Sequence, residues 1–161
     1  MSALDEVKGL AMHCSFSRRM PARAVQLATA TSELDDYGRT QIQRFILRQG
    51  LPCRMARRAV QMAPVNLPGA VSIIGALESL LGKEKTLEIL HEADYDRRLI
   101  DCAVRFGRPK NNRRRLALQL LEHVETIFGA TPELGELLKD SRTAEERKQT
   151  ARSAVAVPTA I

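Results

Sequence analysis

The sequence predicts an all-α fold: a single compact bundle of about eight or nine short helices, with helical-hairpin units of the helix-turn-helix kind and a flexible C-terminal tail. Apolar residues return every three or four positions rather than in strict alternation, which favours helices over strands. Glycine and proline recur where helices would end and restart. The chain has 161 residues, the length of one ordinary domain. We therefore expect a helical domain over residues 1–140, followed by a polar helical turn and a disordered tail over residues 141–161.

The first three helices are expected from their capping residues. Ser2 is suited to cap the first helix, and Pro21 to begin a short second one. Ser32 with Asp35 has the spacing of a capping box and predicts the start of a third helix. Gly50 is expected to end that helix in the left-handed conformation. The face predicted to be buried comprises Leu34, Tyr37, Ile42, Phe45 and Ile46.

A fourth helix is predicted over residues 52–63, and its two faces differ sharply in chemistry. The apolar residues follow the spacing i, i+3, i+4, i+7, which is typical of a helix lying on a core. That apolar face comprises Met55, Ala56, Ala59, Val60 and Ala63, and the opposite face carries Arg54, Arg57, Arg58 and Gln61.

The second half of the chain predicts further helices. Residues 64–69 are expected to form a loop before the most apolar helix, which runs from Ala70 to Gly82. A shorter helix follows, and Asp94 is expected to cap a seventh helix that ends at Gly107. A long eighth helix should begin near Pro109 or Asn111 and a short ninth helix near Thr131. The inward face of the eighth comprises Ala117, Leu120, Leu121, Val124, Ile127 and Phe128.

The positive charge is concentrated in the middle of the chain. The whole chain has 25 Lys and Arg against 19 Asp and Glu, a net charge of +6, whereas residues 18–115 alone carry +9. No acidic residue lies between Asp36 and Glu78, a span that contains six arginines. A second acid-free span, residues 102–121, contains six further basic residues. These two basic segments are the most informative feature for function.

Each basic segment contains a predicted hairpin, in which a helix is followed by a Gly-x-Pro turn and an arginine-bearing helix. A helix-turn-helix places its second helix in the DNA major groove, and guanidinium groups bind phosphate and guanine. The match to that motif is partial, because Arg108 and Arg113 stand where it has apolar residues. The sequence favours a small non-enzymatic nucleic-acid-binding (DNA or RNA) or regulatory protein. Its expected contact residues are Arg54, Arg57, Arg58, Gln61, Arg108, Lys110, Arg113, Arg114 and Arg115.

The mode of nucleic-acid contact is predicted from the aromatic residues, which make up only 4% of the chain. Most of the six fall on helix faces predicted to be buried, which disfavours recognition of single strands by base stacking. Duplex binding or contacts to the phosphate backbone alone are therefore expected.

Two other readings of the arginine faces remain open. A helical adaptor, chaperone or effector could dock an acidic protein through the same residues, and a solvated helix face without any ligand has the same pattern.

A membrane partner is not expected, because the basic faces lack tryptophan and lie opposite alanine-rich faces. Asp5 and Glu6 disfavour a signal peptide, and three scattered cysteines fit a reducing compartment. We expect a cytoplasmic bacterial protein, with a homodimer as one candidate assembly.

Catalysis is not expected. Three distant histidines, no C-x-x-C pair and no glycine-rich loop argue against a metal, a nucleotide or another cofactor. The one exception is Cys53, since a thiol at a helix N-terminus beside Arg54 and Arg57 is placed as reactive cysteines often are.

Two local similarities suggest an internal duplication. Residues 20–28 (MPARAVQLA) are similar to residues 55–63 (MARRAVQMA), and residues 36–52 are similar in layout to residues 94–109. Coincidental helix punctuation in a chain rich in alanine and arginine explains both pairs equally well.

Overall fold

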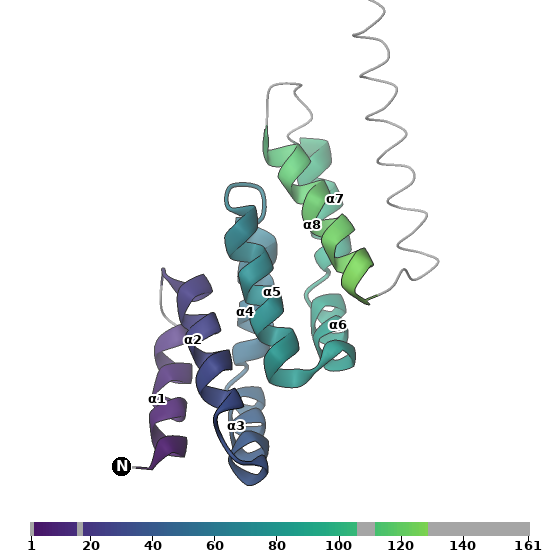
Figure 1. The fold of residues 1–161 in the computed structure, drawn as a ribbon. Helices are drawn as coiled ribbons and strands as arrows, with labels where there is room; N and C mark the ends of the chain where they lie inside the picture. Colours follow the sequence, from purple (N-terminus) through teal and green to yellow (C-terminus); the bar gives the residue numbers. More distant parts are fainter. Residues whose placement is uncertain (1, 16–17, 106–111, 129–161) are drawn as a thin grey trace, which may run out of the picture.

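The computed structural model describes residues 2–15, 18–105 and 112–128, and these residues form eight helices with no strand among them (Figure 1). The predicted all-α fold is confirmed. The predicted ninth helix, the C-terminal tail and the turn at Gly107 lie outside the described residues. The helices are α1 (Ala3–Ser15), α2 (Met20–Ser32), α3 (Asp36–Arg48), α4 (Leu51–Met62), α5 (Leu67–Leu81), α6 (Lys83–Glu92), α7 (Tyr95–Arg105) and α8 (Asn112–Phe128).

Several helix ends follow the capping chemistry read from the sequence. The Ser2 hydroxyl accepts a hydrogen bond from the Asp5 N–H at 3.2 Å and so caps α1. Pro21 lies in the first turn of α2, where no backbone donor is needed. Gly50 has φ +68° between α3 and α4, the left-handed conformation that favours glycine. Gly82, with φ +86°, separates α5 from α6.

The predicted start of α3 was wrong by three residues. Ser32 is the last residue of α2, and its hydroxyl donates to the Thr29 carbonyl at 2.6 Å. The cap of α3 is instead Asp35, whose carboxylate accepts from the Gly38 N–H at 2.7 Å. The serine hydroxyl is thus used within the last turn of its own helix, which leaves the carboxylate as the free acceptor.

The prediction that Tyr37 is buried was also wrong. Tyr37 is 71% exposed, because the face of α3 that meets the core comprises Gly38, Ile42 and Ile46. A residue adjacent to Gly38 points about 100° away from that face.

The expected loop at residues 64–69 ends earlier than predicted, and α5 begins at Leu67. The Asn66 side chain accepts from the Gly69 N–H at 3.0 Å and caps the helix. Pro68 then occupies the first turn, as Pro21 does in α2. The Asn-Leu-Pro-Gly segment falls within the predicted loop. In the structure its asparagine is the N-cap of α5 and its proline lies in the first turn of that helix.

The eight helices form three successive units. The first comprises α1–α3, the second α4–α6, and the third α7 and α8, and the first two helices of every unit pack against each other. Equivalent helices also contact across units: α5 lies between α2 and α8, and α4 lies between α1 and α7 (Figure 1). The result is a two-layer array in which α2, α5 and α8 form one layer and α1, α4 and α7 form the other.

The layer formed by α2, α5 and α8 carries a repeat in its pattern of buried residues. Each of its helices presents four buried residues at spacing i, i+3, i+4, i+7, and the four are displaced by 46 positions from α2 to α5 and by 47 from α5 to α8. The sets are Ala24, Leu27, Ala28 and Thr31 in α2; Ala70, Ile73, Ile74 and Leu77 in α5; and Ala117, Leu120, Leu121 and Val124 in α8. Three copies are the number at which a helical array can bury a continuous core.

This repeat differs from the two similarities noticed in the sequence. Residues 20–28 lie in α2 and residues 55–63 lie in or next to α4, which occupy different places in their units. Residues 36–52 link the first unit to the second, whereas the described part of residues 94–109 forms α7, which begins the third unit. The pairs of segments with similar sequences therefore do not correspond to structurally equivalent helices.

None of the helices within the described ranges is long and apolar enough to cross a membrane.

Candidate anionic-partner interface

The two predicted faces of α4 are present in the structure. Met55, Ala56, Ala59 and Val60 are buried against the neighbouring helices. Arg54, Arg57 and Gln61 are exposed on the opposite side, and Arg58 is partly buried at its edge. The sequence therefore placed this row of arginines correctly with respect to the core.

Helix α3, which packs on α4, carries two further exposed arginines. Arg44 and Arg48 are both exposed, and only Gly50 and Gln49 separate α3 from α4. We call Arg44, Arg48, Arg54, Arg57 and Arg58, together with Gln61, the α3–α4 arginine surface. All of it comes from the first acid-free span, so these two helices contain no acidic residue after Asp36.

Two arginines of the span are held by local contacts. Arg39 pairs with Asp36 one turn earlier in α3, and both side chains are solvent-exposed. Arg54 donates from Nη2 to the Gln49 carbonyl at 2.6 Å, which holds its guanidinium against the turn between α3 and α4. Since a guanidinium has five donors, Arg54 retains capacity for an anion. Exposed Arg44, Arg48 and Arg57 make no ion pair within the described part of the chain.

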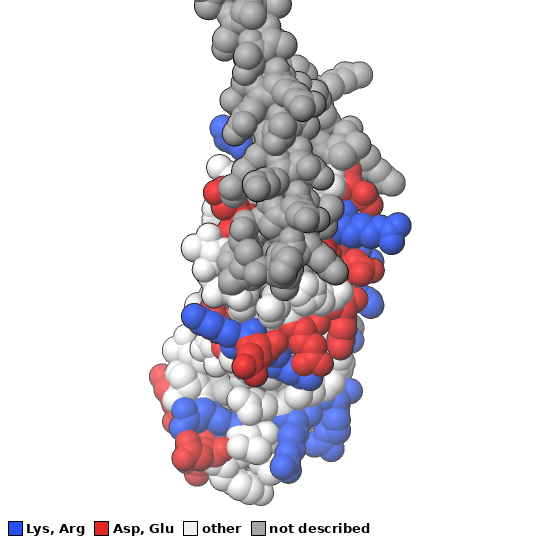
Figure 2. Space-filling model, turned by 90° about the vertical axis from the view of Figure 1, so that its right-hand side faces the viewer, with Lys and Arg blue, Asp and Glu red and all other residues white. Residues whose placement is uncertain are grey.

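The charge is not spread evenly over the molecule. Figure 2 shows Lys and Arg gathered along one lower edge, at the height of α3 in Figure 1, with a band of Asp and Glu above them at the height of α6. Helix α6 carries Glu84, Glu88 and Glu92, all exposed. Lys83 and Lys85 on α6 offset these carboxylates in part, so the positive potential of the basic edge falls at α6.

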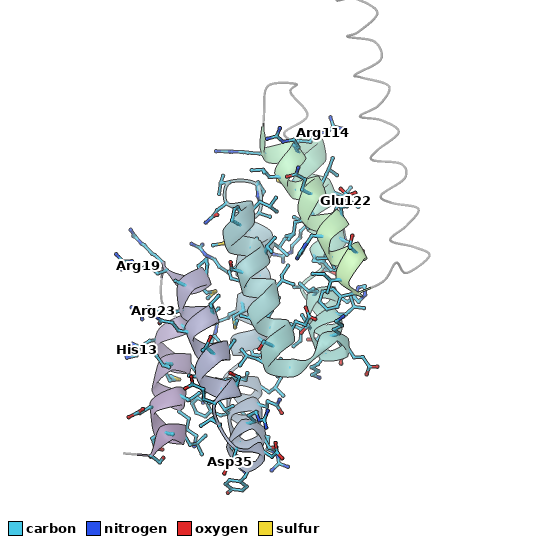
Figure 3. The ribbon with its side chains drawn as sticks, viewed as in Figure 1. His13, Arg19, Arg23, Asp35, Arg114 and Glu122 are labelled. Atoms are coloured by element: carbon cyan, nitrogen blue, oxygen red, sulfur yellow. The ribbon has the colours of Figure 1, made fainter. Side chains whose placement is uncertain are left out.

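The second predicted group of contact residues is only partly described. Arg108 and Lys110 lie outside the described residues. Arg113 and Arg115 are exposed in the first turn of α8, where Arg114 is partly buried and its Nε is buried without a hydrogen-bond partner among the described residues (Figure 3). Helix α8 packs on α5, α6 and α7, in the layer that does not contain α4. The described residues of the two predicted groups thus belong to different units and different layers.

Sequence reasoning missed two exposed side chains beside the arginines. Tyr37 begins the exposed face of α3, and Arg44 follows it by seven residues on the same side of the helix. Leu47, between Arg44 and Arg48 on the exposed surface, is 42% exposed. The correctly predicted buried residues Ile42 and Ile46 already fix the register of the helix, so the spacing could have indicated that both side chains are exposed.

The candidate reactive thiol, Cys53, has a carboxylate neighbour. Its Sγ lies 3.8 Å from Oε2 of Glu92 on α6, so the contact that the structure gives is not with either of the arginines next to it in sequence. No group of three or more His, Cys, Asp or Glu side chains within the described residues is arranged to hold a metal ion. Neither a scan of known protein families nor comparisons with characterised proteins and with solved structures finds a match to this chain.

Proposed function

We propose that this protein is a non-enzymatic binding scaffold whose α3–α4 arginine surface binds the phosphate backbone of a nucleic acid. The observation that supports this most directly is a 41-residue span without an acidic residue that folds into consecutive helices with exposed arginines. Guanidinium groups bind phosphate with forked, charge-assisted hydrogen bonds. Arrays of helical units offer extended surfaces of the kind that a polymeric ligand requires.

The exposed Tyr37 adds unpaired bases to the candidate ligands. A tyrosine ring in line with Arg44 can stack on a base while the guanidinium neutralises an adjacent phosphate. Because Tyr37 is exposed, one reason for expecting duplex binding alone no longer holds, since that expectation assumed that the aromatic residues are buried. We therefore include single strands as ligands of the same surface.

The test is a binding titration followed by fluorescence anisotropy with duplex DNA, duplex RNA and single strands of each. The variant Arg44→Glu, Arg48→Glu, Arg57→Glu uses only fully exposed residues, so its fold should be retained. Three lost phosphate contacts should weaken binding roughly 100-fold near 100 mM salt and reduce the salt slope by about 2 to 3. Tyr37→Ala should weaken single-strand binding by roughly 10-fold and leave duplex binding unchanged.

The matched control reverses three exposed charges elsewhere: Lys83→Glu, Arg97→Glu and Arg98→Glu on α6 and α7. This variant has the same net charge as the first, and it should lose much less affinity. Equal losses in the two variants would mean that net charge alone governs binding. Absence of salt-dependent binding to all four nucleic acids would contradict the proposal.

An acidic protein is the alternative ligand, and exposed Leu47 favours it. Apolar side chains surrounded by arginines are typical of protein interfaces, whereas a phosphate backbone gains nothing from leucine. A complex that persists after nuclease treatment and is lost with Leu47→Ser would identify a protein partner. Nucleic-acid binding should be insensitive to that substitution.

A further inference from the structure

A second basic site lies in the first unit of the array, in a pocket between α1 and the start of α2. Leu10 and His13 line it from α1, and Arg19, Ala22, Arg23 and Gln26 line it from α2 and the residue before it. Its volume is about 290 Å³. Figure 3 shows His13, Arg19 and Arg23 along the same outer edge of the α1–α2 pair. The pocket shares no residue with the α3–α4 arginine surface.

The lining of this pocket has the chemistry of an anion site. All four polar residues carry N–H donors, and two of them are guanidinium groups. No carboxylate is among the lining residues. Leu10 and Ala22 supply an apolar wall, so a ligand with a small carbon skeleton could be held as well as its charged group.

Arg23 is the central residue of the site. Its side chain is partly buried, and it forms no ion pair with any carboxylate of the described residues. Its charge reaches the space between the two helices, where burial raises the pKa of the Cys14 thiol to about 11 and Arg23 acts in the opposite direction. A guanidinium that is partly removed from water without a carboxylate partner gains most from a bound anion.

We infer that this pocket binds a phosphate group, either as free phosphate or at the end of a small phosphomonoester. Arg23 and Arg19 would neutralise the dianion, while His13 and Gln26 donate to its remaining oxygens. Two guanidinium groups suit a dianion better than the single charge of a simple carboxylate. The volume lies at the lower limit for ligand pockets, which restricts the organic part to a few carbon atoms.

The experiment is calorimetric titration of the full chain with inorganic phosphate and, in a second arm, with glycerol phosphate, at constant ionic strength. Arg23→Gln removes the charge and keeps amide donors, and it should weaken binding of either ligand by about 10-fold to 100-fold. Arg98→Gln, which removes an exposed arginine from α7 outside both proposed sites, is the matched control and should leave both affinities unchanged. Tighter binding of glycerol phosphate would show that the apolar wall contributes, and equal binding would identify phosphate itself as the ligand.

The inference is overturned if neither ligand binds with a dissociation constant below about 10 mM, or if acetate competes as well as phosphate. Equal losses in Arg23→Gln and Arg98→Gln would overturn it as well. Should Arg23→Gln fail to fold by circular dichroism, Arg19→Gln takes its place, because Arg19 is exposed and precedes the first residue of α2. Shifts of the backbone amide signals of Ala22 and Gln26 on adding phosphate would locate the ligand independently.

Discussion

Replacement of Leu77 tests the assignment of α5 as the central helix of the array. Its side chain is 0% exposed, and its helix α5 packs against α2, α4, α6 and α8. Leu→Ala substitutions in cores cost about 2 to 5 kcal/mol, and the cost is higher where the surroundings cannot collapse into the cavity. Helices on four sides prevent such collapse, so we expect Leu77→Ala to lower the free energy of unfolding by about 3 to 4 kcal/mol.

The assay is urea unfolding followed by circular dichroism at 222 nm, with Leu47→Ala as control. Leu47 is 42% exposed, and its truncation should cost less than about 1 kcal/mol. For a chain of this size, 1 kcal/mol corresponds to roughly 2 to 4 °C in Tm, so Leu77→Ala should melt roughly 6 to 16 °C lower than the unmodified protein. A loss below about 1 kcal/mol for Leu77→Ala, or equal losses for the two variants, would refute the assignment of α5 as the central helix.

Three further predictions concern single positions. Asp35→Ala should destabilise the fold by about 1 kcal/mol and Ser32→Ala by much less, in the same urea assay, because Asp35 caps α3. Gly50→Ala should cost about 1 kcal/mol because of its positive φ, whereas Gly75→Ala, in open space within α5, should stabilise by roughly 0.5 to 1 kcal/mol; a reversed order would contradict the left-handed turn. The buried thiol of Cys14 has a pKa raised from 9.0 to about 11, so its contribution to stability is fully present below pH 9 and is lost as the pH rises through 11. Cys14→Ala should therefore lose less stability than the unmodified chain over that range, and parallel pH profiles would refute this.

Most of the helices could be predicted because their ends are determined by residues close in sequence. Ser2, Gly50 and Gly82 act through their own backbone or through residues one turn away, and the structure places each at a helix boundary. Where two adjacent residues compete for the same role, local reasoning fails. Ser32 and Asp35 are both good caps, and the choice depends on how far α2 is extended by its packing against α5.

The candidate site was predicted only in part, for a related reason. The amphipathic pattern of α4 fixes which of its residues are exposed, so Arg54 and Arg57 could be placed from the sequence. The repeat of buried residues along α2, α5 and α8 could not be found from sequence identity, because only the alanine at its first position is shared by all three copies. Equivalent burial, rather than identity, defines the units. The pocket between α1 and α2 likewise requires that His13 and Arg23 be brought together by packing.

The arrangement in successive units also has a consequence for how the chain folds. Every substantial helix contact within the described residues joins helices of the same unit or of adjacent units, so residues in contact are seldom much more than one repeat apart in sequence. Chains whose contacts are local in sequence close short loops and fold rapidly, on the microsecond to millisecond scale. Such a chain can begin to fold as it leaves the ribosome, but each unit buries its core only when the helices of the following unit have been added, as α5 is to α2.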